Sequence, residues 1–286
     1  MTQRTLAQTI NSIATSDGAG VKLRRSIGAA RSVRLDPFLM LDEFGTDKPE
    51  DYIAGFPAHP HRGFETVTYM LDGHMRHEDH MGNVGELTAG GVQWMTAAHG
   101  VIHSEMPQQK EGRMRGFQLW INLPAAEKMK PAGYRDIPAA DIPVAKIVGG
   151  RIKVIAGNLA TDAGNVAGPI QGLTTAPVFY DVHLEAGKSF EAALPATHNA
   201  FVYSYEGDVN IGAGDDARTL GAQAAGILSA GDRVRVTAHG APARFIMLAG
   251  KPLKEPVVQY GPFVMNTREE IDQAIRDYQN GTLVAA

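Results

Sequence analysis

The chain alternates between short apolar runs and turn-forming residues along its whole length. The apolar runs are rich in Val, Ile, Thr, Phe and Tyr, and 32 glycine and 16 proline residues lie between and around them. Clear examples are residues 65–71, 92–96, 116–123, 178–184, 200–205 and 244–250. Short β-rich runs with turn signals at roughly ten-residue intervals are typical of an all-β sandwich or barrel. We therefore predict an all-β fold.

Two stretches of the chain resemble each other. Residues 85–100 read GELTAGGVQWMTAAHG and residues 226–240 read GILSAGDRVRVTAHG. With one gap they share a Gly, a Leu, an Ala-Gly pair and the final Thr-Ala and His-Gly pairs. A strand-like run that ends in a turn precedes each stretch, at 68–73 and 202–207. A repeated unit of short strands and glycine turns predicts a small β-barrel that is present twice.

The boundary between the two barrels is predicted near residue 135. Residues 124–150 carry several prolines and little periodicity, which indicates a linker between two domains. We assign residues 1–135 to a first barrel that binds a metal. Residues 136–286 are assigned to a second, metal-free barrel together with a C-terminal helix.

The segment 267–281, TREEIDQAIRDYQNG, is the clearest helix signal in the chain. Thr267 as N-cap and Glu270 three residues later form a capping box, in which the cap alone contributes about 1 kcal/mol. Asn280 and Gly281 supply a stop signal. An apolar stripe at helical spacing predicts that the helix covers a barrel: Ile271, Ile275 and Tyr278.

Composition narrows the possible chemistry. The chain of 286 residues has a net charge of −4, which gives no reason to expect affinity for nucleic acid or for a membrane surface. It has no cysteine, so disulfides, cysteine-ligated metals and thiol catalysis are excluded and any metal must be held by nitrogen and oxygen. The first residues lack the apolar core of a signal peptide, and no apolar run approaches the length of a membrane span. We therefore expect a cytoplasmic protein.

Seven of the ten histidines lie in the stretch from Gly55 to Pro107. Two pairs in this stretch matter most, a His-x-His pair at positions 59 and 61 and a His-x-Glu pair at positions 103 and 105. Residues i and i+2 of a β-strand point to the same face, so each pair can aim both side chains into one cavity from its own strand. Three imidazoles and one carboxylate form a ligand set for a divalent transition metal such as iron, copper, nickel, zinc or manganese.

The identity of the carboxylate ligand is ambiguous on spacing alone. Glu65 shares strand parity with His59 and His61, unless Gly63 marks a bulge that changes the parity. Glu65 and Glu105 therefore both remain candidates. The one that does not bind the metal would support the site or the fold.

The repeat offers an internal control for the predicted site. Alignment of the two copies at their turns places Ala193 and Pro195 opposite the His-x-His pair. It places Ala243 and Phe245 opposite the His-x-Glu pair. The scaffold therefore forms without any of these ligands, and we predict that the second barrel holds no metal. Taken singly, the remaining histidines are more typical of core, surface or turn positions: His74, His77, His80, His99, His183, His198 and His239.

The ligand motifs resemble those of a known family. A His-x-His…Glu run followed by a later Gly-x-x-His is similar to the two motifs of the cupin superfamily. The fuller pattern resembles the pirin family and extends from near residue 20 to near residue 281. The resemblance implies a bicupin, that is, two tandem jelly-roll barrels with one metal in the N-terminal barrel and none in the C-terminal barrel. The segments that carry it are DPFLMLDEFG (36–45), GFPAHPHRGFETVTYMLDG (55–73), TAAHGVIHSEMP (96–107), LWINLP (119–124) and GPFVMNTREEI (261–271).

The resemblance also implies a ligand set and a metal. The pirin pattern carries over to His59 and His61 from the first motif and to His103 and Glu105 from the second. Many other cupins use the Glu of the first motif, which is Glu65 here. The metal implied is Fe(II), with Zn, Ni, Cu, Mn or Co as alternatives, because affinity order alone would favour copper and the ligands do not identify the metal.

Three classes of function follow from the resemblance. Several pirins resemble quercetin 2,3-dioxygenases, which implies that O₂ opens the central ring of a flavonol or a related enol at the metal, with Glu105 as the catalytic proton acceptor. The alternative is a non-enzymatic pirin-type regulator that senses redox state through its metal and binds a protein partner. A zinc or manganese hydrolase or isomerase is a third class, because one fold hosts many chemistries. Several apolar residues could line an aromatic pocket or form plain barrel core: Phe56, Phe64, Met70, Trp94, Met95, Met106 and Phe117.

Overall fold

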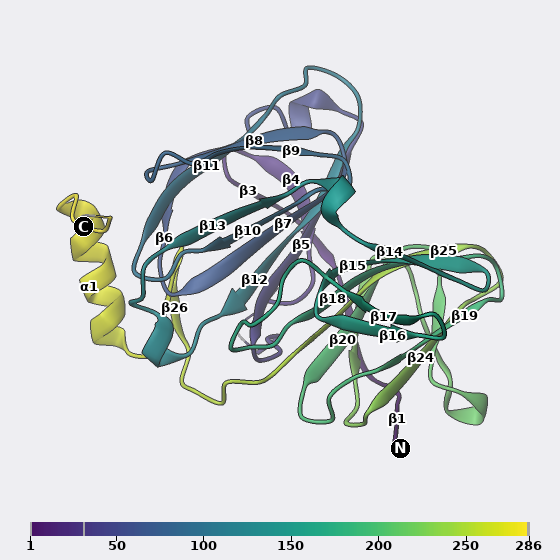
Figure 1. Ribbon diagram of the computed structural model, residues 1–286. Coiled ribbons are helices and arrows are strands. Elements are labelled where there is room, and N and C mark those ends of the chain that lie inside the picture. The colour runs from purple at the N-terminus through teal and green to yellow at the C-terminus, as the bar shows by residue number, and fades with distance from the viewer. Residues whose placement is uncertain (1, 31, 285–286) are drawn as a thin grey trace. The chain divides into compact units, whose positions relative to one another are not determined.

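The computed structural model describes residues 2–30 and 32–284, and its described residues form two compact units (Figure 1). The unit called the first barrel below is made of Ile13–Arg34, Phe38–Ala139 and Leu253–Ala286. The unit called the second barrel is made of Met1–Ser12, Leu35–Pro37 and Ala140–Pro252. The prediction of an all-β chain with two barrels and a C-terminal helix is confirmed.

The first barrel is built from a seven-stranded and a four-stranded sheet. Its strands are β3 Ile13–Asp17, β4 Val21–Arg25, β5 Phe38–Thr46, β6 Phe56–His61, β7 Phe64–Asp72, β8 His74–Asp79, β9 Val84–Thr88, β10 Val92–Thr96, β11 Val101–Pro107, β12 Met114–Asn122, β13 Gly133–Ile137, β26 Val258–Tyr260 and β27 Phe263–Met265. The larger sheet has the order β13-β10-β7-β12-β5-β4-β3, and the smaller sheet has the order β6-β11-β8-β9. Strands β26 and β27 pair with each other.

Strand alternation decides which side chains enter the interior of the first barrel. In β8, Met75 and His77 are buried, whereas Arg76 between them is partly exposed. In β11, His103 and Glu105 are buried and alternate with more exposed neighbours. Because a one-residue slip would exchange the two faces, burial of the apolar set fixes the register of each strand. Both sheets contribute to one apolar cluster, which includes Val21, Phe44, Phe56, Met70 and Met75.

The second barrel repeats the plan with a different interior. Its strands are β1 Gln3–Arg4, β2 Leu6–Asn11, β14 Val144–Ile147, β15 Gly150–Ala156, β16 Asn158–Thr161, β17 Gly164–Ala167, β18 Val178–Leu184, β19 Ser189–Ala193, β20 Asn199–Glu206, β21 Val209–Ile211, β22 Arg218–Leu220, β23 Ala224–Leu228, β24 Arg233–Ala238 and β25 Ala243–Gly250. One sheet has the order β14-β15-β18-β25-β20-β23-β2. The other has the order β1-β24-β21-β22, with β19 also paired to β24. The interior is a single large apolar cluster that includes Tyr180, Phe190, Val234, Val236 and Phe245.

Strands β5 to β12 of the first barrel correspond, in the same order, to strands β18 to β25 of the second barrel. In the first barrel β10 pairs with β7 and β11 pairs with β6; in the second, β23 pairs with β20 and β24 pairs with β19. The alignment of residues 85–100 with residues 226–240 is therefore wrong by one strand. The first stretch covers most of β9 and β10, and the second covers most of β23 and β24. Similar Ala-Gly turns in both stretches caused the error, because a turn sequence does not reveal which strands it joins.

The predicted linker at residues 124–150 is only partly a connection. It contains β13, which pairs with β10, and β14, which pairs with β15. The 3₁₀ turns of the chain are Pro49–Asp51, Ala125–Glu127, Ala139–Asp141 and Gly214–Asp216. The compact units also differ from the predicted division at residue 135, because the N-terminal segment belongs to the second barrel and the C-terminal segment belongs to the first. Strands β1 and β2 pair with β24 and β23, whereas residues from 253 onward belong to the first barrel.

The C-terminal helix α1, Arg268–Gln279, has the predicted capping box. The Thr267 hydroxyl accepts a hydrogen bond from the Glu270 N–H at 3.2 Å, and the Glu270 carboxylate accepts one from the Thr267 N–H at 2.9 Å. The helix packs on β27 of the first barrel through an apolar cluster that contains Phe263, Met265, Ile271, Ala274 and Leu283. No helix in residues 2–30 or 32–284 has the length and apolar character needed to cross a membrane.

Candidate metal centre

Strands β6 and β11 bring three of the predicted ligands together. They pair antiparallel, with His59 directly opposite His103 and with His61 opposite Val101. The ring centroids of His59 and His61 are 4.7 Å apart, those of His59 and His103 are 4.4 Å apart, and those of His61 and His103 are 5.0 Å apart. One ring nitrogen from each histidine lies within 4.8 Å of the other two. The parity argument therefore correctly places these three imidazoles in one cluster.

The ring nitrogens of the cluster are left available for a cation. The carbonyl of Pro57 accepts a hydrogen bond from His59 Nδ1 at 2.8 Å, so this nitrogen carries the proton and Nε2 has the free lone pair. His61 Nδ1 and His103 Nε2 are buried and have no hydrogen-bond partner among the described residues. A buried nitrogen without a partner costs about 1–3 kcal/mol, and a metal ion would remove that cost. The three residues thus fit a metal that accepts nitrogen ligands.

Electrostatics favour neutral imidazoles at this position. Burial, followed by the neighbouring His59, holds the pKa of His61 well below its ordinary value of 6.5. Burial also lowers the pKa of His103 well below 6.5, with further contributions from His61, His59 and His77. Both imidazoles are therefore neutral at neutral pH, so that each ring has one N–H and one nitrogen with a free lone pair. A neutral imidazole is the form that binds a metal.

A chain of hydrogen bonds behind His103 fixes which of its nitrogens is free. His77 Nε2 lies 3.4 Å from Asp79 Oδ2, and His77 Nδ1 lies 3.3 Å from His103 Nδ1. The carboxylate can only accept, so Nε2 of His77 carries a proton and Nδ1 of His77 is the acceptor. His103 must then donate from Nδ1, which leaves its Nε2 lone pair pointing away from His77. The ring of Tyr134 stacks on His77 with centroids 4.3 Å apart and an interplanar angle of 16°.

Glu105 lies next to the cluster but is not one of its members. The pairing of β11 with β6 shifts register between His103 and Glu105, which sets Glu105 opposite Phe56, although both residues stay on the buried face of β11. Glu105 is 2% exposed. Its Oε1 accepts a hydrogen bond from the Thr68 hydroxyl at 2.7 Å, and its Oε2 accepts one from Gln118 Nε2 at 3.0 Å.

Glu65 lies in a different sheet from the histidines. Strand β6 ends at His61 and β7 begins at Phe64, with Gly63 between them at φ +91°. The Glu65 carboxylate accepts a hydrogen bond from the Thr96 hydroxyl of β10 at 2.7 Å. Burial raises the pKa of Glu65 above its ordinary value. The break at Gly63 is the parity change that the sequence left open.

A cavity of about 820 Å³ opens beside the histidine cluster. His59 and His61 lie in its wall, together with Gln118 and Trp120 of β12. Trp120 packs edge-on against His61 with ring centroids 5.3 Å apart, and its Nε1–H donates to Gln118 Oε1 at 3.2 Å. Of the apolar residues predicted near the motifs, Phe56 lines this cavity, whereas Phe64, Met70, Trp94, Met95 and Phe117 are buried in the barrel.

The residues from 260 to 284 cover the turn that follows His61. The Lys128 ammonium donates to the carbonyls of Gly63 at 2.7 Å and Val264 at 3.0 Å, and to Asn122 Oδ1 at 2.6 Å. Burial lowers the pKa of Lys128 to about 8. A Cβ atom on Gly63 would lie 1.9 Å from the Val264 carbonyl oxygen, so only glycine permits this contact.

The Arg62 side chain attaches α1 to the same turn. Its guanidinium pairs with the Asp277 carboxylate at 2.6 Å and donates to the carbonyl oxygens of His99 and Leu283. The Arg62 backbone also bridges to the Pro262 and Val264 segment. The residue next to a metal-ligand candidate therefore fixes the C-terminal helix on the first barrel.

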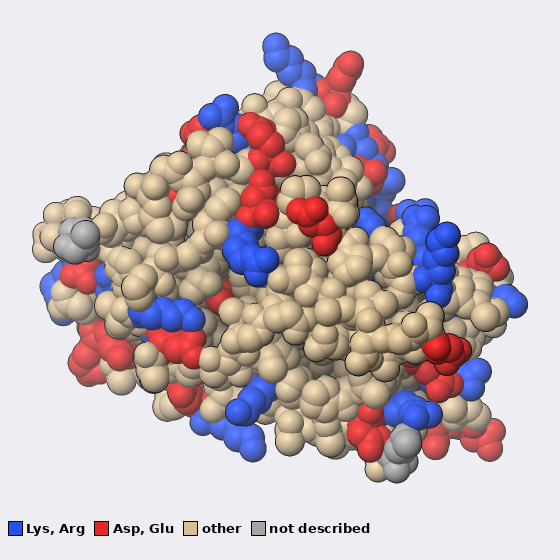
Figure 2. Space-filling model, viewed as in Figure 1, with Lys and Arg blue, Asp and Glu red and all other residues tan. Residues whose placement is uncertain are grey.

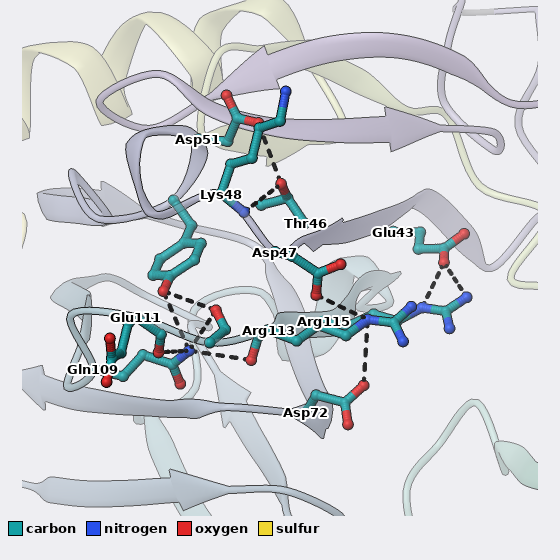
Figure 3. A network of polar contacts seen from close by, with 12 residues as sticks. Glu43, Thr46, Asp47, Lys48, Asp51, Asp72, Gln109, Glu111, Arg113 and Arg115 are labelled. Atoms are coloured by element: carbon teal, nitrogen blue, oxygen red, sulfur yellow. Dashed lines mark hydrogen bonds and ion pairs between the residues drawn. The ribbon is translucent and has the colours of Figure 1, made fainter.

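Another polar network of the first barrel has a different character (Figure 3). Arg115 donates from two guanidinium nitrogens to Glu43 at 2.8 and 3.0 Å, and Arg113 lies between Asp47 and Asp72 at 4.0 and 3.7 Å. These carboxylates are paired with cations rather than grouped with one another. The network holds loops and strand ends together and offers no metal site.

Three residues with a part in the site were not singled out from the sequence. They are His77, Gln118 and Thr68, which contact His103 or Glu105 directly. For His77 a signal existed, because Met75, His77 and Asp79 share the parity that enters the barrel. Gln118 and Thr68 had no sequence signal, because their role depends on the packing of β12 and β7 beside β11.

Comparison with known proteins identifies the family. The Pirin family model matches residues 20–121, and the model of the Pirin C-terminal cupin domain matches residues 179–284. A Pseudomonas aeruginosa protein named "Putative quercetin 2,3-dioxygenase" is 55% identical over 269 residues, which cover 94% of this chain and 94% of that protein. The chain belongs to the pirin family. A pirin-like protein from Caulobacter vibrioides is 51% identical over 268 residues, covering 93% of this pirin and 94% of its relative.

A solved structure agrees with the family assignment. The crystal structure of quercetin 2,3-dioxygenase from Acinetobacter baumannii matches this pirin with a TM-score of 0.89 and 33% sequence identity. The match covers 99% of both chains. The expected fold of two tandem cupin barrels is therefore confirmed over the full length.

Proposed function

We propose that this pirin is a metal-dependent dioxygenase of the quercetin 2,3-dioxygenase type, which opens the ring of a flavonol or a related enol with O₂. The observation that carries the proposal is the cluster of His59, His61 and His103, with unpaired ring nitrogens, beside a cavity of about 820 Å³. The names of the Pseudomonas relative and of the Acinetobacter structure support it. In this reaction a flavonol and O₂ give a depside and carbon monoxide.

The three histidines and Glu105 are the proposed ligands, and Fe(II) is the proposed metal. When bound, Fe(II) would act as a Lewis acid and would carry electron density between an electron-rich ring and O₂. The protein's part is to hold neutral imidazoles in place. Asp79 and His77 do so for His103 through the hydrogen-bond chain described above. Hydrogen bonds of this kind behind a ligand commonly change metal affinity by about 10–100-fold.

The cavity suits a flat aromatic substrate. Its volume lies within the range of about 300–1,000 Å³ that is usual for small-molecule sites. Met40, Phe56 and Trp120 supply apolar walls near the histidines, and Gln118 supplies a polar group. Charged groups also line the cavity: Asp17, Arg25 and Arg34. Beside its apolar walls, a hydrogen bond made to the enol oxygen of the substrate would be stronger than in water.

Glu105 is the proposed acceptor of the proton that the flavonol 3-hydroxyl loses. Its carboxylate is kept in one orientation by the Thr68 hydroxyl and the Gln118 amide. Gln118 lines the cavity, so the hydrogen bond between Gln118 and Glu105 joins the carboxylate to the substrate space. A positioned base of this kind typically accelerates a reaction by about 10²–10⁴-fold.

Oxygen uptake with quercetin tests the proposal. The Fe(II)-loaded protein should consume O₂ in step with quercetin, and His103→Ala should abolish the uptake together with iron binding. His74→Ala is the matched control, because His74 is a partly exposed histidine whose ring bonds Glu86 rather than the cluster. Glu105→Gln should lower turnover by about 10²–10⁴-fold, as expected for loss of a base. A protein with a full complement of iron that leaves quercetin intact would contradict the proposal and favour a regulator that binds a protein partner.

A further inference from the structure

A row of polar residues crosses one sheet of the second barrel. Strand pairing sets Lys146 of β14 opposite Arg151 of β15, and Arg151 opposite His183 of β18. It then sets His183 opposite Arg244 of β25, and Arg244 opposite Glu206 of β20. The row therefore runs straight across five neighbouring strands. The Cβ atoms of directly opposite residues are about 4.5–5.5 Å apart, so every neighbour in the row is within reach of the next.

The row places like charges next to each other. Lys146 and Arg151 are direct cross-strand partners, an arrangement that destabilises a sheet when both residues are charged. Arg244 has a carboxylate partner, Glu206, at 3.3 Å. Within the described part of the chain, neither Lys146 nor Arg151 forms an ion pair with a carboxylate. Figure 2 shows Lys and Arg side chains gathered over the strands that Figure 1 labels β14 and β25. An external anion would relieve this repulsion.

A buried carboxylate beneath the row holds its central residues in place. Asp181 is 1% exposed; its Oδ1 accepts a hydrogen bond from the Tyr205 hydroxyl at 2.6 Å, and its Oδ2 lies 3.1 Å from His183 Nε2. The Arg151 guanidinium lies 3.2 Å from His183 Nδ1. A guanidinium can only donate, so His183 accepts at Nδ1 and donates from Nε2 to Asp181. Through His183, Asp181 thus gives the exposed Arg151 guanidinium one hydrogen-bond contact with the sheet.

These residues open onto a cavity that is separate from the metal centre. Its volume is about 620 Å³, which is a usual size for a small-molecule site. Lys146, Arg151, His183 and Arg244 line it together with Gly149 and Gly150 of the turn between β14 and β15. Apolar side chains from the strand ends, such as Val144, Leu184 and Pro242, complete the wall. Two carboxylates, Glu185 and Glu206, also lie in the wall, and Glu206 pairs with Arg244. The cavity therefore combines an excess of cationic groups with apolar surface.

We propose that this cavity of the second barrel binds a small organic molecule through its phosphate group. A phosphate ester presents three peripheral oxygens and carries between one and two negative charges at neutral pH, so it can accept hydrogen bonds from cations on three sides. A carboxylate presents one oxygen fewer and at most one negative charge, so it would compensate the cationic side chains less fully. Arg151 supplies a planar fork of donors, Lys146 is its cross-strand partner on β14, and Arg244 follows beyond His183 on β25. The flavonol reaction proposed for the first barrel uses no such group, so this is a second site.

Calorimetric titration with inorganic phosphate and with phenyl phosphate tests the site. Arg151→Gln should weaken the binding of both probes at least tenfold, which corresponds to about 1.4 kcal/mol. Arg218→Gln is the matched control, because it removes the same charge from an exposed position of the same barrel and should change the affinity less than about twofold. Phenyl phosphate should bind more tightly than inorganic phosphate, because its ring can cover Val144 and Leu184.

Three outcomes would overturn the proposal. Equal binding by Arg151→Gln and Arg218→Gln would mean that the phosphate is bound elsewhere, for example at the metal of the first barrel. Weaker binding of phenyl phosphate than of inorganic phosphate would exclude an organic phosphate as ligand. No binding at roughly 10 mM of either probe would exclude the site, since even millimolar dissociation constants would register there. The His103→Ala variant should bind both probes as the unchanged protein does, which separates this site from the proposed reaction.

Discussion

The two barrels have the same order of strands but opposite interiors. In the first barrel, β6 and β11 direct His61 and His103 inward, and each of these rings has a buried nitrogen without a partner. The corresponding strands of the second barrel, β19 and β24, place Phe190, Val234 and Val236 in an apolar cluster. A buried polar atom without a partner costs about 1–3 kcal/mol, whereas a buried apolar side chain of this size stabilises by about 1.5–3 kcal/mol. The comparison teaches that the first barrel gives up packing stability to keep three clustered imidazoles, and that the second barrel retains this stability.

A buried carboxylate that pairs with an imidazole occurs in both barrels, but it supports an inward-facing residue in one and an outward-facing residue in the other. In the first barrel, Asp79 and His77 on β8 support His103 inside the barrel. In the second barrel, Asp181 and His183 on β18 support Arg151 on a sheet face away from the apolar cluster. Residues at i and i+2 share a face in both cases. The same local arrangement therefore contacts a histidine of the candidate metal centre in one barrel and an arginine of the proposed anion site in the other.

Phe190→Ala should have the largest effect on this comparison. Phe190 packs against Tyr180 and Phe245 with ring centroids 6.4 and 6.3 Å apart, and it is 2% exposed. Removal of a buried phenyl ring leaves a cavity and typically costs about 3–5 kcal/mol of stability. Urea denaturation would measure the loss of stability, and hydrogen exchange would show whether the loss lies in the second barrel. Glu191→Ala, at the next and exposed position of β19, should cost less than about 0.5 kcal/mol. A Phe190→Ala loss as small as that of the control would contradict an interior that depends on apolar packing.

His77→Phe should weaken metal binding without unfolding the first barrel. The phenyl ring can keep the stacking contact with Tyr134, but it cannot accept the hydrogen bond from His103 Nδ1. Loss of such a support commonly lowers metal affinity by about 10–100-fold, that is, by about 1.4–2.7 kcal/mol. Competition with a fluorescent chelator would measure the affinity, and His74→Phe on the other face of β8 is the control. The same affinity in both variants would remove the proposed role of His77.

Asp277→Asn should have the smallest effect and concerns a feature of the first barrel alone. The Arg62 guanidinium holds the pKa of Asp277 below its ordinary value of 3.8. Because this carboxyl has a lower pKa in the folded state, its stabilising contribution is present above pH 3.8 and is lost as the pH falls through the folded pKa. The substitution should cost about 0.5–1 kcal/mol at pH 7, since the pair is partly exposed. The cost should shrink as the pH is lowered from 7 toward 2, because the carboxyl becomes protonated in the folded state as the pH falls through its folded pKa.

Thermal unfolding at the two pH values and hydrogen exchange of α1 would measure this effect. Asp272→Asn is the matched control, because its contact with Arg268 at 3.9 Å lies on the exposed face of the same helix. Faster exchange of α1 in Asp277→Asn than in Asp272→Asn is the expected result. Equal exchange in the two variants would show that apolar packing alone holds the helix on the barrel.

Strand parity was sufficient to predict where the three histidines meet. His59 and His61 are separated by one residue in a regular strand, and β11 runs beside that strand in the register that sets His103 opposite His59. Parity did not extend to Glu65, because the chain leaves β6 at Gly63. Glu105 keeps the parity of His103 within β11, although the pairing with β6 shifts between them. Backbone irregularities of this kind depend on packing between strands that are distant in the sequence. Whether Glu105 binds a metal therefore stays a prediction.

The sequence did not predict which surface a given segment packs against. The helix and its capping box followed from Thr267 and Glu270, yet nothing in their pattern showed which barrel α1 covers. An apolar stripe such as Ile271 and Ile275 fits any complementary apolar surface. The alignment of the two repeats failed for a related reason, because similar Ala-Gly turns join different strands in the two copies. Local signals thus predicted the elements, and long-range pairing determined their neighbours.

Because the C-terminal segment belongs to the first barrel, this barrel can be completed only after the whole chain has been synthesised. Strands β26 and β27 and helix α1 cover the turn after His61, but the ribosome makes them only after all of β14–β25. At translation rates of roughly 5–20 residues per second, the interval between synthesis of the strands that carry the histidines and synthesis of this covering segment is on the order of ten seconds. The nascent first barrel is therefore without this cover while the second barrel emerges. A fragment cut at residue 135 would remain in that unfinished state, and the complementary fragment would lack β1 and β2.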